Sequence, residues 1–273
     1  MSDTEYYTAE YYTTENESTA TIEKDGETHE ELGQNDDEDK KENEEKNEEE
    51  EKKEPPEPEQ DPLEGITYED DPDAELPQYG EQSYWDERYT NDSECFEWYQ
   101  EPEALLPICQ EFIDPEKNVL VIGTGTSELT PYLSQNGFEN ITAIDYSKIA
   151  IKKMKKRNQE IENITWKVMD IRKMSFFPNS DFQSVIDKGT LDCLFHVSES
   201  DVFSALSEIS RVLKRRGVYI CVSYAPPEER KEFFERPADL NLELEKVIEL
   251  KKPVPSDEPH YVYIVRKCGK LLT

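Results

Sequence analysis

The feature that most constrains the fold is a regular alternation of apolar runs and helix-like segments from residue 118 onward. Apolar runs predict strands at 118–122, 141–145, 163–169, 182–186, 218–223, 242–250 and 260–265. Cap residues, stop residues and helical spacing predict helices over 127–135, over 147–157, and from 198 to a stop at Gly217. Such alternation is typical of a mostly parallel sheet with helices on both faces. The sequence therefore predicts an α/β, Rossmann-like fold with seven strands.

The last two predicted strands follow one another with little room for a helix between them. Parallel neighbours need a long crossover connection, whereas antiparallel neighbours need only a turn or a short loop. We therefore expect these two strands to pair as an antiparallel hairpin at one edge of the sheet.

The first quarter of the chain has a different composition. Residues 1–76 hold 31 acidic and six basic side chains, a net charge of −25 out of −33 for the whole chain. Residues 48–51 are all glutamate, and prolines recur at 55, 56, 58, 62 and 72. A segment of this kind repels itself and lacks the apolar surface that folding requires. We expect a disordered acidic tail with a proline-rich spacer over 1–76, and a folded domain over 77–273.

Composition also argues against several classes of protein. The start of the chain lacks the basic and apolar regions of a secretory signal, and no apolar run reaches the roughly 18 residues of a membrane span. A net charge of −33 disfavours direct binding to nucleic acid. The cysteines form no C-x-x-C pair and only three histidines occur. We therefore expect reduced thiols, a cytoplasmic location and no metal site.

The loop after the first strand is the first candidate site. Gly123-Thr124-Gly125 follows the apolar run, and Asp145 ends the next strand 22 residues after Gly123. Glycines permit a tight turn and a close approach to a ligand, and a carboxylate near this spacing suits ribose hydroxyls. The alternatives are a plain structural turn, and a carboxylate that stabilises the start of a helix. The combination favours nucleotide binding.

Nearby acidic residues indicate which nucleotide is bound. A dinucleotide site needs a third glycine beside its pyrophosphate, but position 128 is Glu, whose charge would repel a phosphate. Two later strands also end near carboxylates, Asp170 and Asp187. An adenosyl ligand with a positive charge and no phosphate suits these surroundings. The expected cofactor is therefore S-adenosylmethionine, a sulfonium cation.

Longer motifs carry a resemblance to a known family. They are Tyr84-Trp85-x-x-Arg88-Tyr89, Phe96-Glu97-Trp98-Tyr99, Ile144-Asp145-Tyr146-Ser147, Met169-Asp170-Ile171-Arg172-Lys173, Asp187-Lys188-Gly189-Thr190-Leu191-Asp192 and Gly269-Lys270-Leu271. With them the chain resembles class I S-adenosylmethionine-dependent methyltransferases. Within that class it resembles the lysine methyltransferases of translation elongation factor 1-alpha, of the type encoded at the endothelin-converting-enzyme-2 locus. The resemblance runs from about residue 79 to 223 and resumes at the last strand, whereas residues 226–259 match poorly.

The resemblance implies which residues contact the cofactor. They are Trp85, Tyr89, Trp98, Gly123, Gly125, Asp145, Tyr146, Asp170, Ile171 and Lys188. Ordinary packing is the alternative role of the three aromatic rings among them. Asp187 is a candidate to face the substrate amine, with a helix or turn cap as its alternative role.

The resemblance also implies transfer of a methyl group to a lysine of elongation factor 1-alpha, a protein partner. Such a transfer is an in-line displacement by a neutral amine, which needs positioning but no dedicated nucleophile. We therefore assign no catalytic residue, and we expect no membrane partner. Two alternatives stay open: methylation of another protein or a small molecule, and a non-catalytic interaction module that binds S-adenosylmethionine.

Overall fold

The computed structural model describes residues 6–8, 78–92, 94–235, 240–253, 256 and 258–269. The predicted tail, residues 1–76, lies outside these ranges except for Tyr6–Thr8, which form strand β1. Lys270 and Leu271 of the terminal motif also lie outside them. All five cysteines are described, and none forms a disulfide. Within the described ranges no helix has the length and apolar character needed to cross a membrane.

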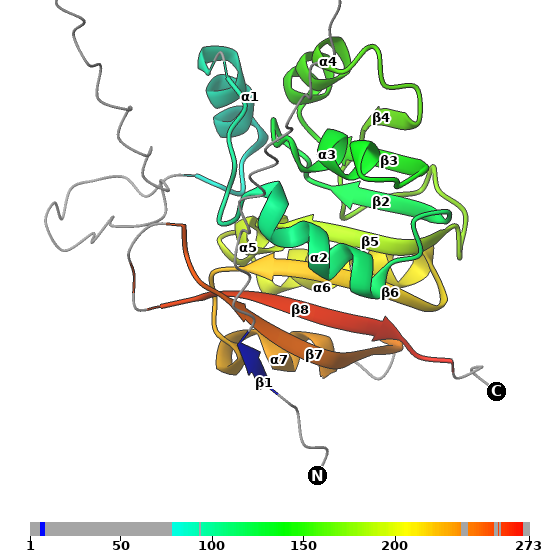
Figure 1. Cartoon of the computed structure of the whole chain (residues 1–273). Helices are drawn as coiled ribbons and strands as arrows, with labels where there is room; N and C mark the ends of the chain where they lie inside the picture. The colour runs from blue at the N-terminus through cyan, green and yellow to red at the C-terminus, as the bar shows by residue number, and fades with distance from the viewer. Residues whose placement is uncertain are drawn as a thin grey trace, which may run out of the picture. The chain divides into compact units, whose positions relative to one another are not determined.

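The described strands form one eight-stranded sheet in the order β1-β7-β8-β6-β5-β2-β3-β4 (Figure 1). After β1 the strands are β2 (Asn118–Ile122), β3 (Asn140–Asp145), β4 (Ile164–Val168), β5 (Phe182–Lys188), β6 (Leu213–Ser223), β7 (Leu242–Leu250) and β8 (His260–Lys267). Neighbours pair in parallel except at β8, which is antiparallel to both β6 and β7. The seven predicted strands and their hairpin are confirmed. The sequence did not reveal β1, which adds an eighth strand beside β7.

Helices cover both faces of this sheet (Figure 1). Successive side chains of a strand point to opposite faces, and in the central strand β2 the side chains of both faces are apolar and buried. The helices are α1 (Gln82–Asn91), α2 (Pro102–Phe112), α3 (Leu129–Gln135), α4 (Lys148–Arg157), α5 (Thr190–Phe195), α6 (Glu199–Val212) and α7 (Pro227–Glu235). In β2, Leu120 and Ile122 pack into one apolar core with residues of α5, α6 and α7. Val119 and Val121 pack into the other core, with residues of α2 and α3. The predicted α/β fold is confirmed.

One predicted boundary is wrong. The helix that begins after Ser198 ends at Val212 and does not continue to Gly217, because Leu213 already belongs to β6. Leu213 pairs with Phe182 of β5, and the register then shifts, so that Ser184 pairs with Val218. The apolar side chain of Leu213 keeps helical spacing with α6 but packs as part of a strand.

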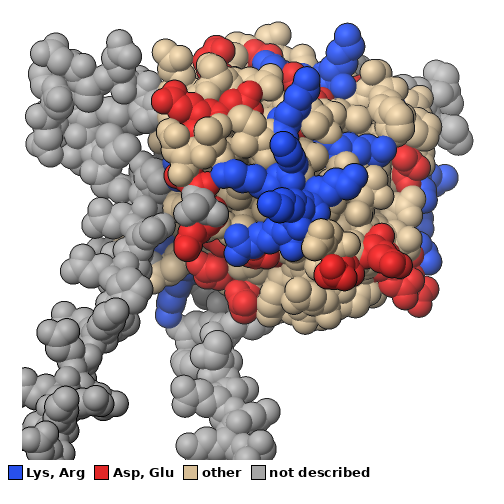
Figure 2. All heavy atoms as spheres, turned by 90° about the horizontal axis from the view of Figure 1, so that it is seen from above, with Lys and Arg blue, Asp and Glu red and all other residues tan. Residues whose placement is uncertain are grey.

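The outer face of α4 is basic, although the chain as a whole is acidic. Its buried side chains are Ala150, Ile151 and Met154. Its exposed side chains are all basic: Lys148, Lys152, Lys155, Lys156 and Arg157. Figure 2, which views the molecule from the side where α4 lies, shows Lys and Arg side chains gathered on this face. Charge is therefore distributed very unevenly over the domain.

The strand order places a candidate site at one edge of the sheet. From β2 the chain moves outward through β3 and β4, and then returns to the other side of β2 for β5 and β6. These strands are parallel, so their carboxyl ends lie at the same edge of the sheet. The connection after β2 leads to one side of that strand, and the connection after β4 leads back to the other side, so the strand order reverses between β2 and β5. Ligands of open α/β sheets bind in the crevice at such a reversal.

The core of α6 provides a test of this packing. Leu206 is fully buried between α6 and the sheet, so Leu206→Ala should lower the free energy of unfolding by about 2–5 kcal/mol. Ser204→Ala on the exposed side of the same helix should change it by less than about 0.5 kcal/mol. Urea unfolding of the two variants measures the difference, and equal effects would contradict the buried face assigned to α6.

Candidate functional site

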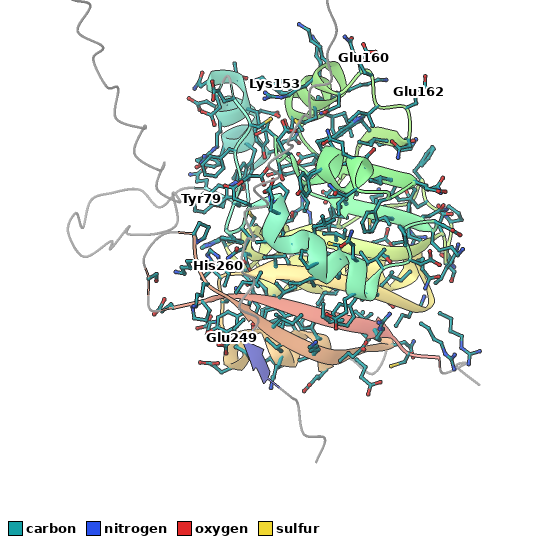
Figure 3. All side chains as sticks on the ribbon, viewed as in Figure 1. Tyr79, Lys153, Glu160, Glu162, Glu249 and His260 are labelled. Atoms are coloured by element: carbon teal, nitrogen blue, oxygen red, sulfur yellow. The ribbon has the colours of Figure 1, made fainter. Side chains whose placement is uncertain are left out.

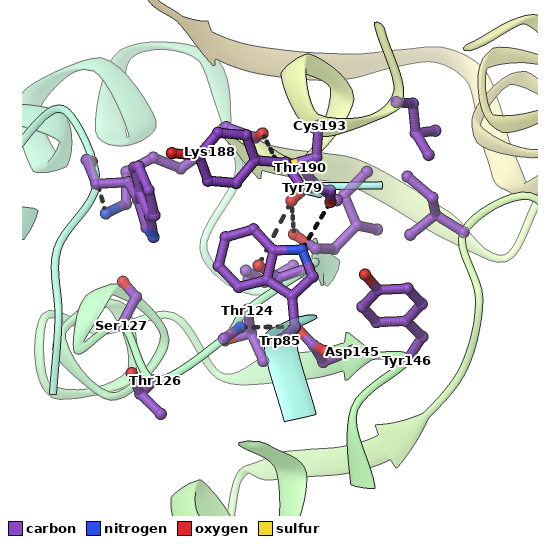
Figure 4. A pocket seen from close by; sticks show the side chains of 18 of the residues that line it. Tyr79, Trp85, Thr124, Thr126, Ser127, Asp145, Tyr146, Lys188, Thr190 and Cys193 are labelled. Atoms are coloured by element: carbon purple, nitrogen blue, oxygen red, sulfur yellow. Dashed lines mark hydrogen bonds between the residues drawn. The ribbon is translucent and has the colours of Figure 1, made fainter. Parts of the chain in front are cut away.

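A pocket opens at the carboxyl edge of the sheet, between β2, β3, β4, β5 and the segment that carries α1. It lies at the reversal of the strand order, the crevice where ligands of open α/β sheets bind. Figure 4 shows Asp145, Tyr146 and Trp85 around it, with Lys188 and Thr190 on the β5 side. All ten residues predicted to contact the cofactor line this pocket: Trp85, Tyr89, Trp98, Gly123, Gly125, Asp145, Tyr146, Asp170, Ile171 and Lys188.

The loop after β2 has a backbone that only glycine adopts easily at two positions. Gly123 has φ +54° and Gly125 has φ +50°. A Cβ at Gly123 would lie 2.0 Å from the Thr190 hydroxyl oxygen, and a Cβ at Gly125 would lie 2.7 Å from the Tyr89 hydroxyl oxygen. Any larger residue at either position would therefore collide with Thr190 or Tyr89.

Asp145 links this loop to the end of β3. Its carboxylate accepts hydrogen bonds from the backbone N–H of Gly125 at 2.9 Å and of Ser147 at 2.8 Å. Burial raises the pKa of Asp145 to about 6, although the two backbone hydrogen bonds act to lower it. The role at the start of α4 is therefore present, and the side chain also lines the pocket, where the predicted contact with ribose hydroxyls stays a prediction.

The N-terminus of α3 is occupied by the carboxylate of Glu97, a residue that sequence reasoning placed in a motif but not in the site. Glu97 accepts hydrogen bonds from the backbone N–H of Glu128 and from the Ser127 hydroxyl. The side chain of Glu128, predicted to repel a pyrophosphate, instead pairs with Arg157 at 3.0 Å. The position where a helix N-terminus would bind a phosphate is therefore occupied by the Glu97 carboxylate. The conclusion is unchanged, because a carboxylate at a helix N-terminus takes the place of a phosphate.

Lys188 at the end of β5 holds the Glu97 segment in place. Its Nζ donates to the Glu97 carboxylate at 2.5 Å and to the Trp98 carbonyl at 2.9 Å. The Lys188 side chain is only 5% exposed. It is both a wall of the pocket and a tie between β5 and the segment before α2.

Aromatic rings from α1 and from the segment before α2 also line the pocket. Trp85 and Tyr89 of α1 stack at 5.7 Å between ring centroids, and Trp98 meets Trp85 edge-on at 5.8 Å. The Trp85 indole N–H donates to the Tyr79 carbonyl at 2.7 Å. Figure 3 labels Tyr79, which lies at the same edge of the molecule as His260, the first residue of β8. These rings pack against one another and also line the pocket, so packing does not exclude a role in binding.

The segment after β4 supplies the remaining wall. Asp170 and Ile171 line the pocket there, and Asp170 accepts hydrogen bonds from the backbone and guanidinium of Arg172. Burial acts to raise the pKa of Asp170, but the hydrogen bonds and charge of Arg172 outweigh it, so the pKa is lowered. Asp170 is therefore charged at neutral pH.

Asp187 does not line the pocket. Its side chain is fully buried, and its carboxylate accepts from the N–H of Thr190 at 2.8 Å, from the N–H of Leu191 at 3.1 Å and from the Tyr219 hydroxyl at 2.8 Å. The predicted role facing the substrate amine does not match this geometry. The alternative role does, because the carboxylate satisfies the first N–H groups of α5.

Asp187→Ala should therefore lower the free energy of unfolding by roughly 2–4 kcal/mol, since it leaves buried donors without an acceptor. Asp187→Asn, which keeps an acceptor oxygen and the shape, should cost less. Asp181→Ala, at the opposite end of β5, is the matched control. Thermal and urea unfolding check these values. An Asp187→Ala variant as stable as the wild type would contradict the assignment of Asp187 to folding.

Comparisons with known proteins agree with this geometry. Residues 120–221 match the family model described as a methyltransferase domain. EEF1A lysine methyltransferase 4 of Bos taurus is 32% identical over 178 residues, which are 58% of this chain and 69% of the bovine protein. The Mus musculus protein of that name is 34% identical over 165 residues, 56% of this chain and 64% of its own length. The eEF1A lysine and N-terminal methyltransferase of Homo sapiens is 36% identical over 154 residues, but these cover only 22% of it.

Solved structures support the fold alone. A structure described by the conversion of a disulfide bond into a thioacetal group during echinomycin biosynthesis has a TM-score of 0.54 and 16% identity, over 70% of this chain and 94% of its own. The cyclase SpnF has a TM-score of 0.53 and 14% identity, over 71% and 97%. At such identities the shared architecture does not specify a reaction. The family follows instead from the match to the bovine relative and the methyltransferase domain: the chain belongs to the S-adenosylmethionine-dependent methyltransferases.

Proposed function

We propose that this protein transfers a methyl group from S-adenosylmethionine to a lysine of translation elongation factor 1-alpha. The observation that carries the proposal is a pocket at the strand-order reversal, beside which the N-terminus of α3, the usual phosphate position, holds the Glu97 carboxylate. The names of the relatives support the acceptor. Their similarity covers 64% of the mouse protein, so the acceptor is a proposal for this chain.

The residues of the pocket fit the cofactor. The Asp145 carboxylate at the end of β3 suits the ribose hydroxyls, with Tyr146 beside it. Asp170 and Ile171 would meet the adenine, and Gly123 and Gly125 carry no side chain that would separate the loop backbone from the ligand. The aromatic rings and the carboxylates that line the pocket suit the positive charge of a sulfonium group.

The chain contributes positioning and exclusion of water to the reaction. When bound, the cofactor supplies the methyl group: the lone pair of the acceptor amine forms the new N–C bond as the electron pair of the S–C bond returns to sulfur. The methylated amine then loses a proton to solvent. Trp85, Tyr89 and Trp98 surround the ligand with apolar surface, and a lysine amine placed there would lose its charge more easily. No protein nucleophile is required.

Cofactor binding should depend on pH through Asp145. Ribose hydroxyls donate to the ionised carboxylate, so affinity should be full above the pKa of about 6 and should fall as pH drops through it. At pH 5 about one tenth of the carboxyl is ionised, which predicts about tenfold weaker binding than at pH 7. Calorimetric titration of S-adenosylmethionine from pH 5 to 8 measures this. Asp145→Asn should bind weakly at every pH, and a variant with the wild-type pH profile would contradict the assignment.

Incubation of the protein with purified elongation factor 1-alpha and tritiated S-adenosylmethionine tests the function. We expect label on one or more lysines of the factor, located by mass spectrometry, and loss of label when Asp145→Ala removes the ribose contact. Lysine-to-arginine variants of the factor at the labelled position are the matched control. Label on another protein or on a small molecule from a cell extract, and none on elongation factor 1-alpha, would show that the proposed acceptor is wrong. Cofactor binding without any labelled product would favour a non-catalytic module.

A further inference from the structure

Tyr99 has a strained backbone beside the pocket. Its φ is +66°, a region that bulky residues rarely adopt, and the N–H of Gln100 donates to the Trp98 carbonyl at 2.7 Å across it. A three-residue turn with positive φ at its centre is rare and costs conformational energy. Four described residues other than glycine have positive φ, and of these only Tyr99 lines the pocket. Such strain persists only where the surroundings hold it.

Three contacts from β5 and α5 hold Tyr99. Lys188 binds the Trp98 carbonyl at 2.9 Å, and the Tyr99 hydroxyl donates to Asp192 at 3.1 Å. The ring lies over Gly189, where a Cβ would come within 3.0 Å of it. Gly189 itself has φ +80°. The position of the Tyr99 ring is therefore determined from several directions.

Asp192 connects Tyr99 with the carboxyl end of β6 and with α7. Its carboxylate accepts from the Ser223 hydroxyl at 2.7 Å and from the Tyr224 N–H at 3.3 Å, and it pairs with Arg230 at 3.2 Å. The side chains of Asp192 and Arg230 are 3% and 5% exposed. A buried ion pair adds little net stability against an apolar alternative. Its presence here indicates that it fixes geometry.

Tyr224 extends this arrangement to the surface. It follows the carboxyl end of β6, is 39% exposed, and its ring centroid lies 6.2 Å from that of Tyr99. The residues expected to hold the nucleoside, Asp145 and Asp170, follow β3 and β4 on the other side of β2. Tyr224, partly exposed, thus contacts Tyr99, a ring that lines the pocket on the side away from the expected nucleoside residues.

We propose that Tyr99 and Tyr224 form the subsite for the acceptor lysine, and that Asp192 and Arg230 are positioning residues that hold the two rings in register. This inference rests on the proposed function. The aliphatic part of a lysine would pack along the exposed side of the Tyr224 ring toward Tyr99, and aromatic faces tolerate its charge before the proton is lost to solvent. Asp192 already accepts from four groups, so it orients the rings and does not take up the proton. The second carboxylate of Asp187-Lys188-Gly189-Thr190-Leu191-Asp192 thus serves the acceptor side, and the first serves folding.

Steady-state kinetics of the full chain with elongation factor 1-alpha test the subsite. Tyr224→Ala should raise KM for the factor about tenfold while the Kd for S-adenosylmethionine stays within about twofold. Tyr99→Phe, which removes one hydroxyl, and Asp192→Asn should lower kcat/KM with the same unchanged Kd. Phe176→Ala removes an equally aromatic but 68% exposed side chain outside the pocket and should change none of these values. An unchanged KM for Tyr224→Ala, or a Kd that rises as much as kcat/KM falls for Tyr99→Phe, would overturn the proposal.

A second measurement does not depend on the identity of the protein substrate. Nα-acetyl-lysine methylamide, added with S-adenosylhomocysteine to protein labelled at tyrosine rings, should shift the NMR signals of Tyr99 and Tyr224 in a saturable way. Tyr132 on α3 is the control and should not shift. If the wild type fails to label elongation factor 1-alpha, the proposed function fails and these shifts alone decide the subsite. Saturable shifts elsewhere, or none at Tyr99 and Tyr224, would reject it.

Discussion

The buried ion pair between Glu97 and Lys188 is the interaction on which the pocket depends. Its atoms lie 2.5 Å apart, and the side chains are 12% and 5% exposed. Glu97 covers the N-terminus of α3, and Lys188 ends β5, so the pair fastens the segment between α1 and α2 across the carboxyl edge of the sheet. Loss of one partner leaves the other charge buried and unpaired, which in proteins typically costs about 3–5 kcal/mol. Trp98 and Tyr99 owe their places at the pocket to this contact.

Local signals explain why much of the architecture could be predicted from the sequence. Buried parallel strands are apolar throughout, and the loop at Gly123 and Gly125 needs a backbone that glycine provides, so both are visible along the chain. The role of Asp187 was not visible, because two carboxylates five residues apart differ only in what the fold brings to them. The position of Glu97 at α3 depends on a contact across 31 residues. The pairing of β1 with β7 spans most of the chain and leaves no local pattern.

The proposed acceptor subsite includes one residue from the segment that matches the family pattern poorly. Arg230 belongs to α7, within the segment 226–259, yet its guanidinium stacks on Phe195 at 3.8 Å and reaches Asp192. The segment with the weaker resemblance is thus joined by direct contacts to Asp187-Lys188-Gly189-Thr190-Leu191-Asp192, one of the motifs that carry the resemblance. The likeness to the cyclase SpnF shows how little the architecture restricts chemistry. Specificity in this fold resides in such edge segments and in the loops that follow the strands.

The place of β8 has a consequence for the order of assembly. It follows β7 in the chain but lies between β6 and β7 in the sheet, and it pairs with both. During synthesis β7 therefore emerges before the strand that joins it to the sheet, and the outer edge of β6 stays open until residues 260–267 are made. An open apolar edge is the form of a sheet most prone to pair with other chains. Until β8 is in place, the edge of β6 is thus exposed to pairing with other chains.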